Sequence, residues 1–346
     1  MNETKTSRGI PEKVARWLLA IALLSIPLAI FGARFITKYP FGEQVVEIHA
    51  RMPQAGGWSI NDITIEAGEP LHLRLVSDDV VHGFAIGQSE QPAIDMLPGK
   101  VVETTLTFDK PGKYTYYCTR WCGIDHWRMR GTIDVTYPAG STGEQIGVDK
   151  ANQPFYLSLG LDIDSPHPAD NVPSSRPSTN RGASLGLKLP TKYSDDQYYF
   201  THSPEEIWLD LKQSLNQDGL SEQQVWDLVA FIWQENTTED RLLSGKKLYS
   251  ENCAACHGEN GNGNGVMAKP VETNHQDMDG HSIVAPLDFT NPNHMLGANP
   301  ALLEGKITRG GMGTGMPYWG PIFTREQIRS LVDYLWTFQF EIEVNP

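Results

Sequence analysis

The four cysteines most constrain what this chain can fold into, because all of them lie in two short motifs. Cys118 and Cys122 form the first pair, and Cys253 and Cys256 form the second, which His257 follows directly. No cysteine remains outside these motifs for a disulfide framework or a free nucleophile. A chain of 346 residues has room for two or three domains. We therefore predict two redox centres in separate domains.

The first motif gathers soft metal ligands on one loop. Cys118 and Cys122 are followed by His126 and Met129, and His82 supplies a second imidazole from another strand. Thiolate, imidazole and thioether ligands together favour copper over hard metals. The second cysteine allows both sulfurs to bridge two coppers, which keeps the change in geometry on reduction small. A zinc site or a loop disulfide is the alternative, but neither uses Met129 or explains His82.

The second motif, Cys-x-x-Cys-His, is the attachment sequence of a c-type haem. Cys253 and Cys256 are expected to form the two thioethers, and His257 is expected to be one axial ligand of the iron. A thioredoxin-like redox pair or a chance match is the alternative. For the second axial ligand we predict Met316 rather than Met312, because Met316 precedes a proline and then a helix, an order that resembles the Met-Pro loop of small cytochromes c.

Further histidines and a proline near the second motif have predicted roles. We expect the carbonyl of Pro286 to orient the ring of His257. The other histidines of this Gly/Asn-rich segment, His275, His281 and His294, are expected at the surface, and the alternative is that one of them binds the haem iron if neither methionine does.

The composition along the chain predicts a multi-domain protein. Residues 41–138 contain short alternating apolar runs separated by Gly and Pro turns, which predicts an all-β sandwich or small barrel. Residues 139–189 are rich in Pro, Ser, Asn and Gly, which predicts a surface linker. Residues 190–238 are predicted to be helical, and residues 239–346 to form an all-α cytochrome c domain.

Two helical segments resemble each other. Residues 220–233 and 323–336 each begin near a Ser or Thr cap, share their apolar spacing and end in Trp. They are either two amphipathic helices of common design, or a sign that residues 190–238 are a relic of a duplicated cytochrome unit. Such a relic holds no covalent haem, because no cysteine lies between Cys122 and Cys253.

The N-terminus is basic and the remainder is acidic. Residues 1–38 carry a charge of +4 within a total of −14, so the other residues carry −18, which excludes a nucleic-acid partner. Trp17–Ala33 is a run of seventeen residues without a charge, preceded by basic residues. We predict that residues 1–38 are a tail and a single retained transmembrane helix in the cytoplasmic membrane, with the later domains on the periplasmic side. A cleavable signal peptide is the alternative.

The copper motif resembles a known family. His82 with Cys118-x3-Cys122-x3-His126-x2-Met129 is similar to the CuA signature of subunit II of haem–copper oxidases. The resemblance implies a cupredoxin sandwich, a binuclear copper centre and the backbone carbonyl of Arg120 as a weak ligand. The chain departs from the family in having Arg120 where many members carry Glu, and one predicted span instead of a two-helix hairpin.

The resemblance also implies a function. The chain would be the electron-transfer subunit of a respiratory oxidase, cytochrome c oxidase subunit II, with one covalently bound haem c passing electrons to CuA. The oxygen site would lie on a separate multi-span haem–copper subunit in the membrane. The external donor would be a basic cytochrome, another soluble carrier or a quinol-oxidising complex. A CuA-containing subunit of a nitric oxide reductase and a free-standing membrane-anchored carrier are the alternatives.

Overall fold

The computed structural model describes residues 13, 14, 17, 23, 45–89, 91–123, 125–138, 154–214, 219–268, 285–311 and 315–342. The predicted membrane segment Trp17–Ala33 lies outside these residues, apart from Trp17 and Leu23. Within the described ranges, no helix has both the length and the apolar character that crossing a bilayer requires.

The N-terminal half of the described chain is a β-sandwich of two sheets. Its strands are β1 (Val45–Ala50), β2 (Asp62–Glu66), β3 (Pro70–Ser77), β4 (His82–Ile86), β5 (Ile94–Met96), β6 (Val101–Thr107), β7 (Gly112–Tyr117) and β8 (Arg130–Thr136). One sheet has the order β1-β3-β6 and the other has the order β2-β8-β7-β4-β5. β1 runs parallel to β3 and β2 runs parallel to β8, whereas the other paired strands are antiparallel. The predicted all-β region is therefore confirmed.

Alternating side chains explain most of this sandwich. In β3 every second residue is buried, so one face of the strand packs into the core and the other faces outward. β4 has no such alternation, because all five of its residues are buried. The core between the sheets centres on Phe84, Tyr116 and Trp58, whose rings pack edge-on or stacked with centroids 5.4–6.0 Å apart. β4 is thus a central, covered strand, and it carries His82 at its first position.

The C-terminal half is helical. Its α-helices are α2 (Phe155–Ser158), α3 (Thr179–Ser184), α4 (Asp196–Thr201), α5 (Pro204–Ser214), α6 (Glu222–Glu235), α7 (Glu239–Asn252), α8 (Ala254–His257), α9 (Pro292–Met295), α10 (Pro300–Arg309) and α11 (Arg325–Leu335). Short 3-10 helices are η1 (Pro53–Ala55), η2 (His126–Arg128), η4 (Thr191–Ser194) and η5 (Trp336–Phe338). One hydrophobic core joins the helices, with Trp226, Trp233 and Trp336 among its largest fully buried side chains.

The predicted linker over residues 139–189 differs from what the structure has there. Residues 154–189 include α2 and α3 and are fixed to the helical core. Thr179 and Gly182 of α3 are buried, and the Ser178 amide donates a hydrogen bond of 2.8 Å to Asp227 of α6. This segment lacks apolar periodicity because its small residues pack by close backbone approach. The predicted linker therefore contains two helices, α2 and α3, and α3 packs against the helical core.

The two similar helical segments take part in similar helix crossings. α3 crosses α6 at Gly182, where an added Cβ would lie 2.1 Å from the carbonyl oxygen of Asp227. α7 crosses α11 at Gly245, where an added Cβ would lie 2.0 Å from the carbonyl oxygen of Ser330. Asp227 and Ser330 occupy the same position in the two aligned segments. The similarity therefore extends from sequence to the mode of packing.

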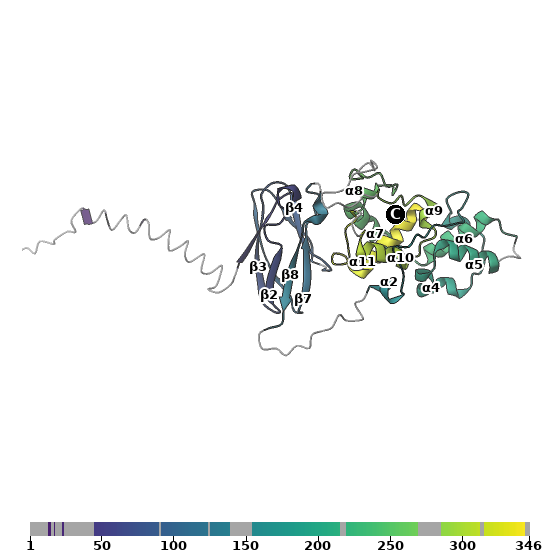
Figure 1. The fold of residues 1–346 in the computed structure, drawn as a ribbon, viewed down its shortest axis with the longest axis horizontal. Coiled ribbons are helices and arrows are strands. Elements are labelled where there is room, and N and C mark those ends of the chain that lie inside the picture. The colour runs from purple at the N-terminus through teal and green to yellow at the C-terminus, as the bar shows by residue number, and fades with distance from the viewer. Residues whose placement is uncertain are drawn as a thin grey trace, which may run out of the picture.

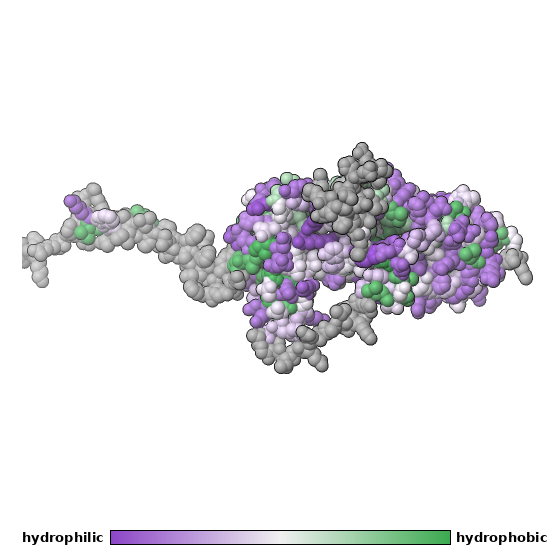
Figure 2. All heavy atoms as spheres, in the orientation of Figure 1, coloured by the Kyte–Doolittle hydropathy of each residue, from purple (hydrophilic) through white to green (hydrophobic). Residues whose placement is uncertain are grey.

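The two halves of the described chain are in contact. Figure 1 shows α7, α8 and α11 beside the β-sandwich, whereas α4, α5 and α6 lie on the side away from it. The helices next to the sandwich are those that carry the second cysteine motif and follow Met316. Figure 2 shows mainly hydrophilic residues over the helical half in the same view, and a hydrophobic area over the sandwich.

Candidate metal and haem sites

The first cysteine motif lies on the loop between β7 and β8. Cys118 follows the last residue of β7, and Met129 precedes the first residue of β8. The Cys118 amide donates a hydrogen bond of 3.0 Å to the Met129 carbonyl, which closes the base of the loop. The neighbouring strand β4 begins at His82. Two segments that are distant in sequence, the loop between β7 and β8 and the start of β4, therefore bring their ligands to one end of the sandwich.

The sulfur atoms of this loop are close together and shielded from water. The Sγ atoms of Cys118 and Cys122 are 3.8 Å apart, and Cys122 Sγ lies 3.3 Å from Met129 Sδ. Cys122 Sγ also lies 3.4 Å from His126 Nδ1. Cys118, Cys122 and Met129 are at most 4% exposed, which is low enough to exclude water from the sulfurs. Sulfur and nitrogen donors at these separations suit a soft metal ion.

His82 completes the cluster from β4. Its Nδ1 lies 3.8 Å from Cys118 Sγ, and its Nε2 lies 2.7 Å from Asp79 Oδ1. Asp79 is itself fixed by the backbone amides of Met52 and Val80, each at 2.6 Å. Burial opposes the charged imidazole, but hydrogen bonds with Cys118 and Asp79 outweigh it and raise the pKa of His82. The Asp79 carboxylate thus holds Nδ1 of His82 toward the sulfurs, as carboxylates do for metal-binding histidines.

The two thiols interact strongly with each other. The hydrogen bond from Cys122 lowers the pKa of Cys118, and the same hydrogen bond raises the pKa of Cys122. Two buried thiolates this close cannot both form without a cation to offset their repulsion. The described residues His82, Cys118 and Cys122 offer ligand atoms that all lie within 4.8 Å of one another. The donor set therefore fits copper, with bound metal allowing both cysteines to ionise.

The backbone carbonyl and the side chain of Arg120 point in different directions. Its carbonyl oxygen lies 3.3 Å from Cys118 Sγ, so it faces the sulfur cluster. Its guanidinium forms two parallel hydrogen bonds of 2.8 and 2.9 Å with Asp95, outside the cluster. The position of the carbonyl is compatible with the weak ligand implied by the family resemblance. The side chain itself is occupied by Asp95.

The second cysteine motif follows the end of α7. Cys253 caps α7, and α8 carries Cys256 and His257. The amides of Cys256 and His257 both donate to the Cys253 carbonyl, at 3.1 and 2.9 Å, which makes the motif one tight turn. Burial raises the pKa of Cys253 to about 12 and also raises that of Cys256. Both cysteines are therefore neutral thiols, the form that adds across a vinyl group.

His257 is oriented by its own surroundings. Its Nδ1 lies 3.0 Å from the Leu287 carbonyl, and its ring stacks on Phe289 with centroids 4.5 Å apart. Burial lowers the pKa of His257, which favours the neutral imidazole. Because Nδ1 is occupied, Nε2 is the atom free to bind iron. These residues fit a c-type haem.

The predicted role of Pro286 is wrong by one residue. The Pro286 carbonyl faces Gly263, where an added Cβ would lie 2.7 Å from it. The next carbonyl along the extended chain, that of Leu287, faces His257. Successive carbonyls of an extended segment point in opposite directions, so a shift of one residue changes the partner.

The candidate axial methionine lies beside the helical core. Met316 is partly buried against the core cluster, together with Cys253 and Leu287. Its carbonyl accepts a hydrogen bond of 3.0 Å from the Gly311 amide, which holds the two ends of this loop together. Met312 lies outside the described residues, so the preference for Met316 stays a prediction.

The histidines near this loop have separate outcomes. His294 is exposed in α9, as predicted. His275 and His281 lie outside the described residues.

Comparisons with known families match these two halves separately. Residues 58–136 match the family model described as cytochrome C oxidase subunit II, periplasmic domain. Residues 242–339 match the model described as cytochrome c. The fold and both sites thus define a two-domain redox protein with a copper-type β-domain and a haem-type helical domain. One region of the chain is thus similar to the periplasmic domain of cytochrome c oxidase subunit II, and a later region is similar to cytochrome c.

Individual relatives match one half each. The chain is 36% identical over 81 residues to cytochrome c oxidase subunit 2 of Thermus thermophilus, covering 23% of this chain and 59% of that protein. It is 32% identical over 121 residues to the cbb3-type cytochrome c oxidase subunit CcoP of Azospirillum brasilense, covering 35% of this chain and 36% of that protein. The chain therefore spans less than two thirds of the length of these curated relatives.

A solved structure also matches in part. The periplasmic domain of subunit II of cytochrome oxidase of Bradyrhizobium japonicum aligns with a TM-score of 0.24 at 21% identity. The alignment covers 28% of this chain and 87% of that chain.

Sequence reasoning identified the candidate copper ligands but missed the residues that hold them in place. Asp79 lies three residues before His82, and a carboxylate at that spacing was the available signal. The stacking partner Phe289 and the Leu287 carbonyl follow no motif. Their roles depend on a contact across about thirty residues of sequence, which spacing alone does not predict.

Proposed function

We propose that this chain is the electron-transfer subunit of a respiratory haem–copper oxidase. A covalently bound haem c would receive electrons from an external donor, and a binuclear copper centre would pass them to a separate catalytic subunit that reduces oxygen. The observation that carries the proposal is one chain with two complete donor sets: His82, Cys118, Cys122, His126 and Met129 for copper, and a Cys-x-x-Cys-His turn with an oriented histidine for haem.

The copper-site residues would hold two metal ions with little rearrangement. Cys118, Cys122, His82 and His126 would hold the metal ions, and Met129 and the Arg120 carbonyl would be the weaker ligands. Asp79 would keep the His82 ring in place. Because these groups are buried and braced before metal binds, they favour one geometry in both oxidation states, which makes electron transfer fast.

The haem-site residues would fix the cofactor and its potential. Cys253 and Cys256 would form the thioethers, His257 would bind through Nε2, and Met316 would be the opposite axial ligand. Haem held in this way supplies one-electron chemistry at a raised potential. Phe289, stacked on His257, keeps the ring from rotating. The Leu287 carbonyl keeps a proton on Nδ1, which leaves Nε2 with its lone pair.

We also propose that the N-terminal run Trp17–Ala33 anchors the chain in the cytoplasmic membrane. The copper and haem domains would then lie on the periplasmic side. In this arrangement the catalytic partner would be a multi-span membrane subunit, and an acidic body that carries −18 of the total charge of −14 suits a basic soluble donor. This topology supports electron entry from outside the membrane.

The central test is the acceptor used by the intact complex. The complex is solubilised from membranes, its partner chains are identified, and its consumption of oxygen and of nitric oxide is measured. We expect a multi-span haem protein and oxygen uptake. Nitric oxide reduction without oxygen uptake would identify the alternative reductase. Absence of any multi-span partner would identify a free-standing carrier.

The copper assignment has a spectroscopic test. Cys122→Ser should abolish the near-infrared absorption typical of a mixed-valence copper pair and leave the haem spectrum intact. Cys122 is buried between Cys118, His126 and Met129, so its loss removes the bridge. Arg128→Gln on the same loop is the control and should retain the band. Survival of the band in Cys122→Ser would exclude a cysteine-bridged centre.

A further inference from the structure

The two domains meet at residues that lie next to the ligands of both sites. Arg130 begins β8 directly after Met129, and Tyr117 ends β7 directly before Cys118. Arg130 and Tyr117 are paired across β7 and β8. Both side chains contact the helical half rather than the sandwich core. The edge of the copper loop is therefore also the interface with the cytochrome domain.

Arg130 forms the most direct connection. Its Nη1 donates a hydrogen bond of 2.7 Å to the carbonyl of Tyr318, which lies two residues after Met316. Its guanidinium also lies over the rings of Tyr318 and Trp319, 4.8 and 5.4 Å from their centroids. One hydrogen bond thus links the residue next to a copper ligand with the loop that carries the predicted haem ligand.

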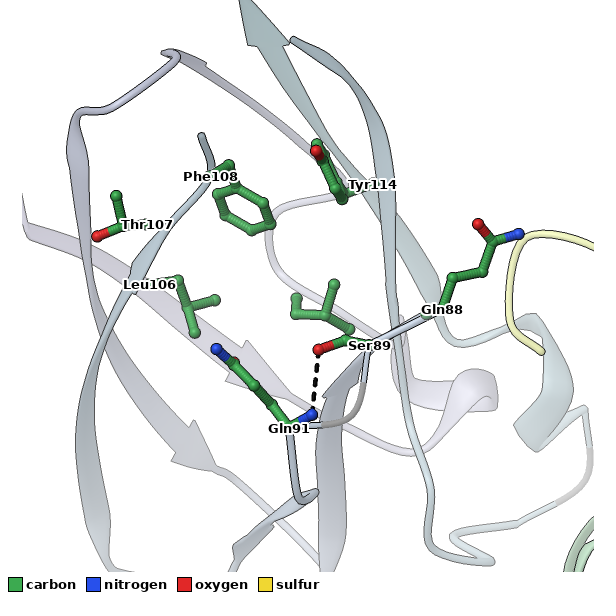
Figure 3. A pocket seen from close by; sticks show the side chains of 9 residues that line it. Gln88, Ser89, Gln91, Leu106, Thr107, Phe108 and Tyr114 are labelled. Carbon is green, nitrogen blue, oxygen red and sulfur yellow. Dashed lines mark hydrogen bonds between the residues drawn. The ribbon is translucent and has the colours of Figure 1, made fainter. Parts of the chain in front are cut away.

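The same loop packs against β4 and the residues that follow it. An added Cβ on Gly87 would lie 2.1 Å from the Pro321 carbonyl oxygen, so only glycine allows this approach. The backbone amide of Gln88 donates a hydrogen bond of 2.8 Å to the Ile322 carbonyl, and its side-chain Nε2 donates one of 2.6 Å to the Gly320 carbonyl. Figure 3 shows the Gln88 side chain pointing to this loop, away from the pocket that Gln91 and Phe108 line. Backbone-to-backbone contact of this kind fixes the register between the domains.

A third contact lies beside the cysteine turn of the cytochrome domain. Tyr117 packs against the helical core cluster although it belongs to β7. Tyr117 lies close enough to Glu251 for the two groups to interact electrostatically. Glu251 precedes Cys253 by two residues. Both sides of the haem site, the cysteine turn and the Met316 loop, therefore face the copper loop.

We propose that residues 317–323 form a fixed docking surface for the copper domain, and that Arg130 is the bridge for electron transfer between the two centres. The route runs from Met316 along the backbone to the Tyr318 carbonyl, across the hydrogen bond to Arg130, and on to Met129. The step moves one electron from the reduced haem iron to the oxidised copper pair, with no bond made or broken and no proton moved. This inference rests on the proposed function.

Two variants of the full-length, metal-loaded chain test the proposal, with the rate of electron transfer from haem to copper measured after rapid photoreduction of the haem. Arg130→Gln removes the bridge and should slow the transfer about tenfold. This is the change expected when one charge-assisted hydrogen bond is lost and fewer molecules have the two domains docked. Arg130→Lys, which keeps a donor and the charge, should restore part of the rate. Arg128→Gln is the matched control with the same charge change on the other side of Met129.

Gly87→Ala tests the contact between the domains without changing Arg130. The backbone of Gly87 is not in the left-handed region, so the added methyl group acts through its contact with the backbone of Pro321 and Ile322 in the other domain. We expect faster hydrogen–deuterium exchange in residues 84–89 and 318–323, together with a slower transfer. Gln88→Ala should have a smaller effect in the same direction. Gln91→Ala, whose side chain lies in the pocket instead, should have none.

The outcomes distinguish this inference from the proposed function. An unchanged rate in Arg130→Gln would overturn the bridge, and unchanged exchange in Gly87→Ala would overturn the interface. Failure of the unmodified chain to bind copper would overturn the proposed function instead. The exchange measurement reports on the interface with or without bound metal.

Discussion

The helix pairs α3/α6 and α7/α11 cross in the same way, but the segments between the two helices of each pair differ. In each pair a glycine of the first helix, Gly182 or Gly245, packs directly against a backbone carbonyl of the second helix. α6 and α11 both begin with a complete capping box. Only in the second pair is the first helix followed by a Cys-x-x-Cys-His turn. The helix crossing is therefore a scaffold that does not depend on haem.

The segment between the helices makes the difference. Between α3 and α6, aromatic side chains fill the interior, as in the stacked pair Trp208 and Trp226 with centroids 5.3 Å apart. The corresponding segment between α7 and α11 carries the cysteine turn, His257 and Met316. Aromatic side chains thus occupy in one unit the kind of space that a haem would need in the other. This contrast supports the hypothesis that residues 190–238 belong to a haem-less relic, and the packing of α3 extends that unit back to Thr179–Ser184.

The largest expected effect tests whether the first unit holds any haem. In the double variant Cys253→Ser, Cys256→Ser, covalent haem should fall to zero, because no cysteine lies between Cys122 and Cys253. Haem staining of the denatured chain measures this. Cys122→Ser is the control and should keep its covalent haem. Staining that persists in the double variant would place a covalent haem elsewhere and break the comparison.

The next effect tests whether the two crossings are equivalent in energy. Gly182→Ala and Gly245→Ala each place a methyl group about 2 Å from a carbonyl oxygen, so each should lower the free energy of unfolding by about 1–3 kcal/mol. Thermal unfolding of the full chain, followed by haem absorbance and by circular dichroism, measures both. The exposed neighbours Ser184→Ala and Ser244→Ala are the matched controls.

Haem absorbance in the same unfolding experiment also shows whether the two units unfold together. Trp233 and Trp336, one from each unit, pack with ring centroids 5.5 Å apart in one shared core. Gly182→Ala should therefore lower the midpoint of the haem signal as well. A haem midpoint that responds only to Gly245→Ala would mean that the two units unfold independently.

Much of the fold and of the copper site could be predicted from the sequence, because short-range patterns determine them. The alternation of apolar and polar residues predicted strands such as β3. The short sequence spacing of Cys118, Cys122, His126 and Met129 alone predicted that they lie on one loop. β4 gave no strand pattern, because it is covered on both faces.

The parts that could not be predicted depend on contacts between distant segments. α3 reads as a linker, since its residues are small and polar, and it is stabilised by the approach of Gly182 to α6. Gly87 and Arg130 belong to no motif, yet they define the interface between the domains. Pairing of this kind is a property of the folded surface, which residue spacing does not encode.

A smaller effect distinguishes the units by their response to acid. Asp210, in the first unit, accepts hydrogen bonds from Tyr193 and Tyr198, at 2.9 and 2.7 Å, and pairs with Lys192. Burial opposes its charge, but these partners outweigh burial and lower the pKa of Asp210. Its contribution is therefore present above the unfolded pKa and lost as the pH falls through the folded value. We expect Asp210→Asn to cost about 1–2 kcal/mol near neutral pH and to weaken the loss of stability below about pH 4.

The measurement is the unfolding midpoint of both proteins from pH 3 to pH 7. Tyr198→Phe, which removes a single hydrogen bond, should give an intermediate curve. Parallel curves for Asp210→Asn and the unmodified chain would show that another carboxyl group controls the acid limb. In that case the aromatic interior of the first unit would not depend on this ionised group.

The smallest effect compares the starts of the two matching helices. Ser221 accepts a hydrogen bond of 3.2 Å from the Gln224 amide, and Thr324 accepts one of 3.2 Å from the Gln327 amide. Ser221→Ala and Thr324→Ala should each cost about 1 kcal/mol, the usual cost of losing a helix cap. Equal losses in chemical denaturation would mean that the two units keep the same helix start. A cost confined to Thr324→Ala would mean that tertiary packing alone holds the start of α6, and that the resemblance of the two units ends at their glycine crossings.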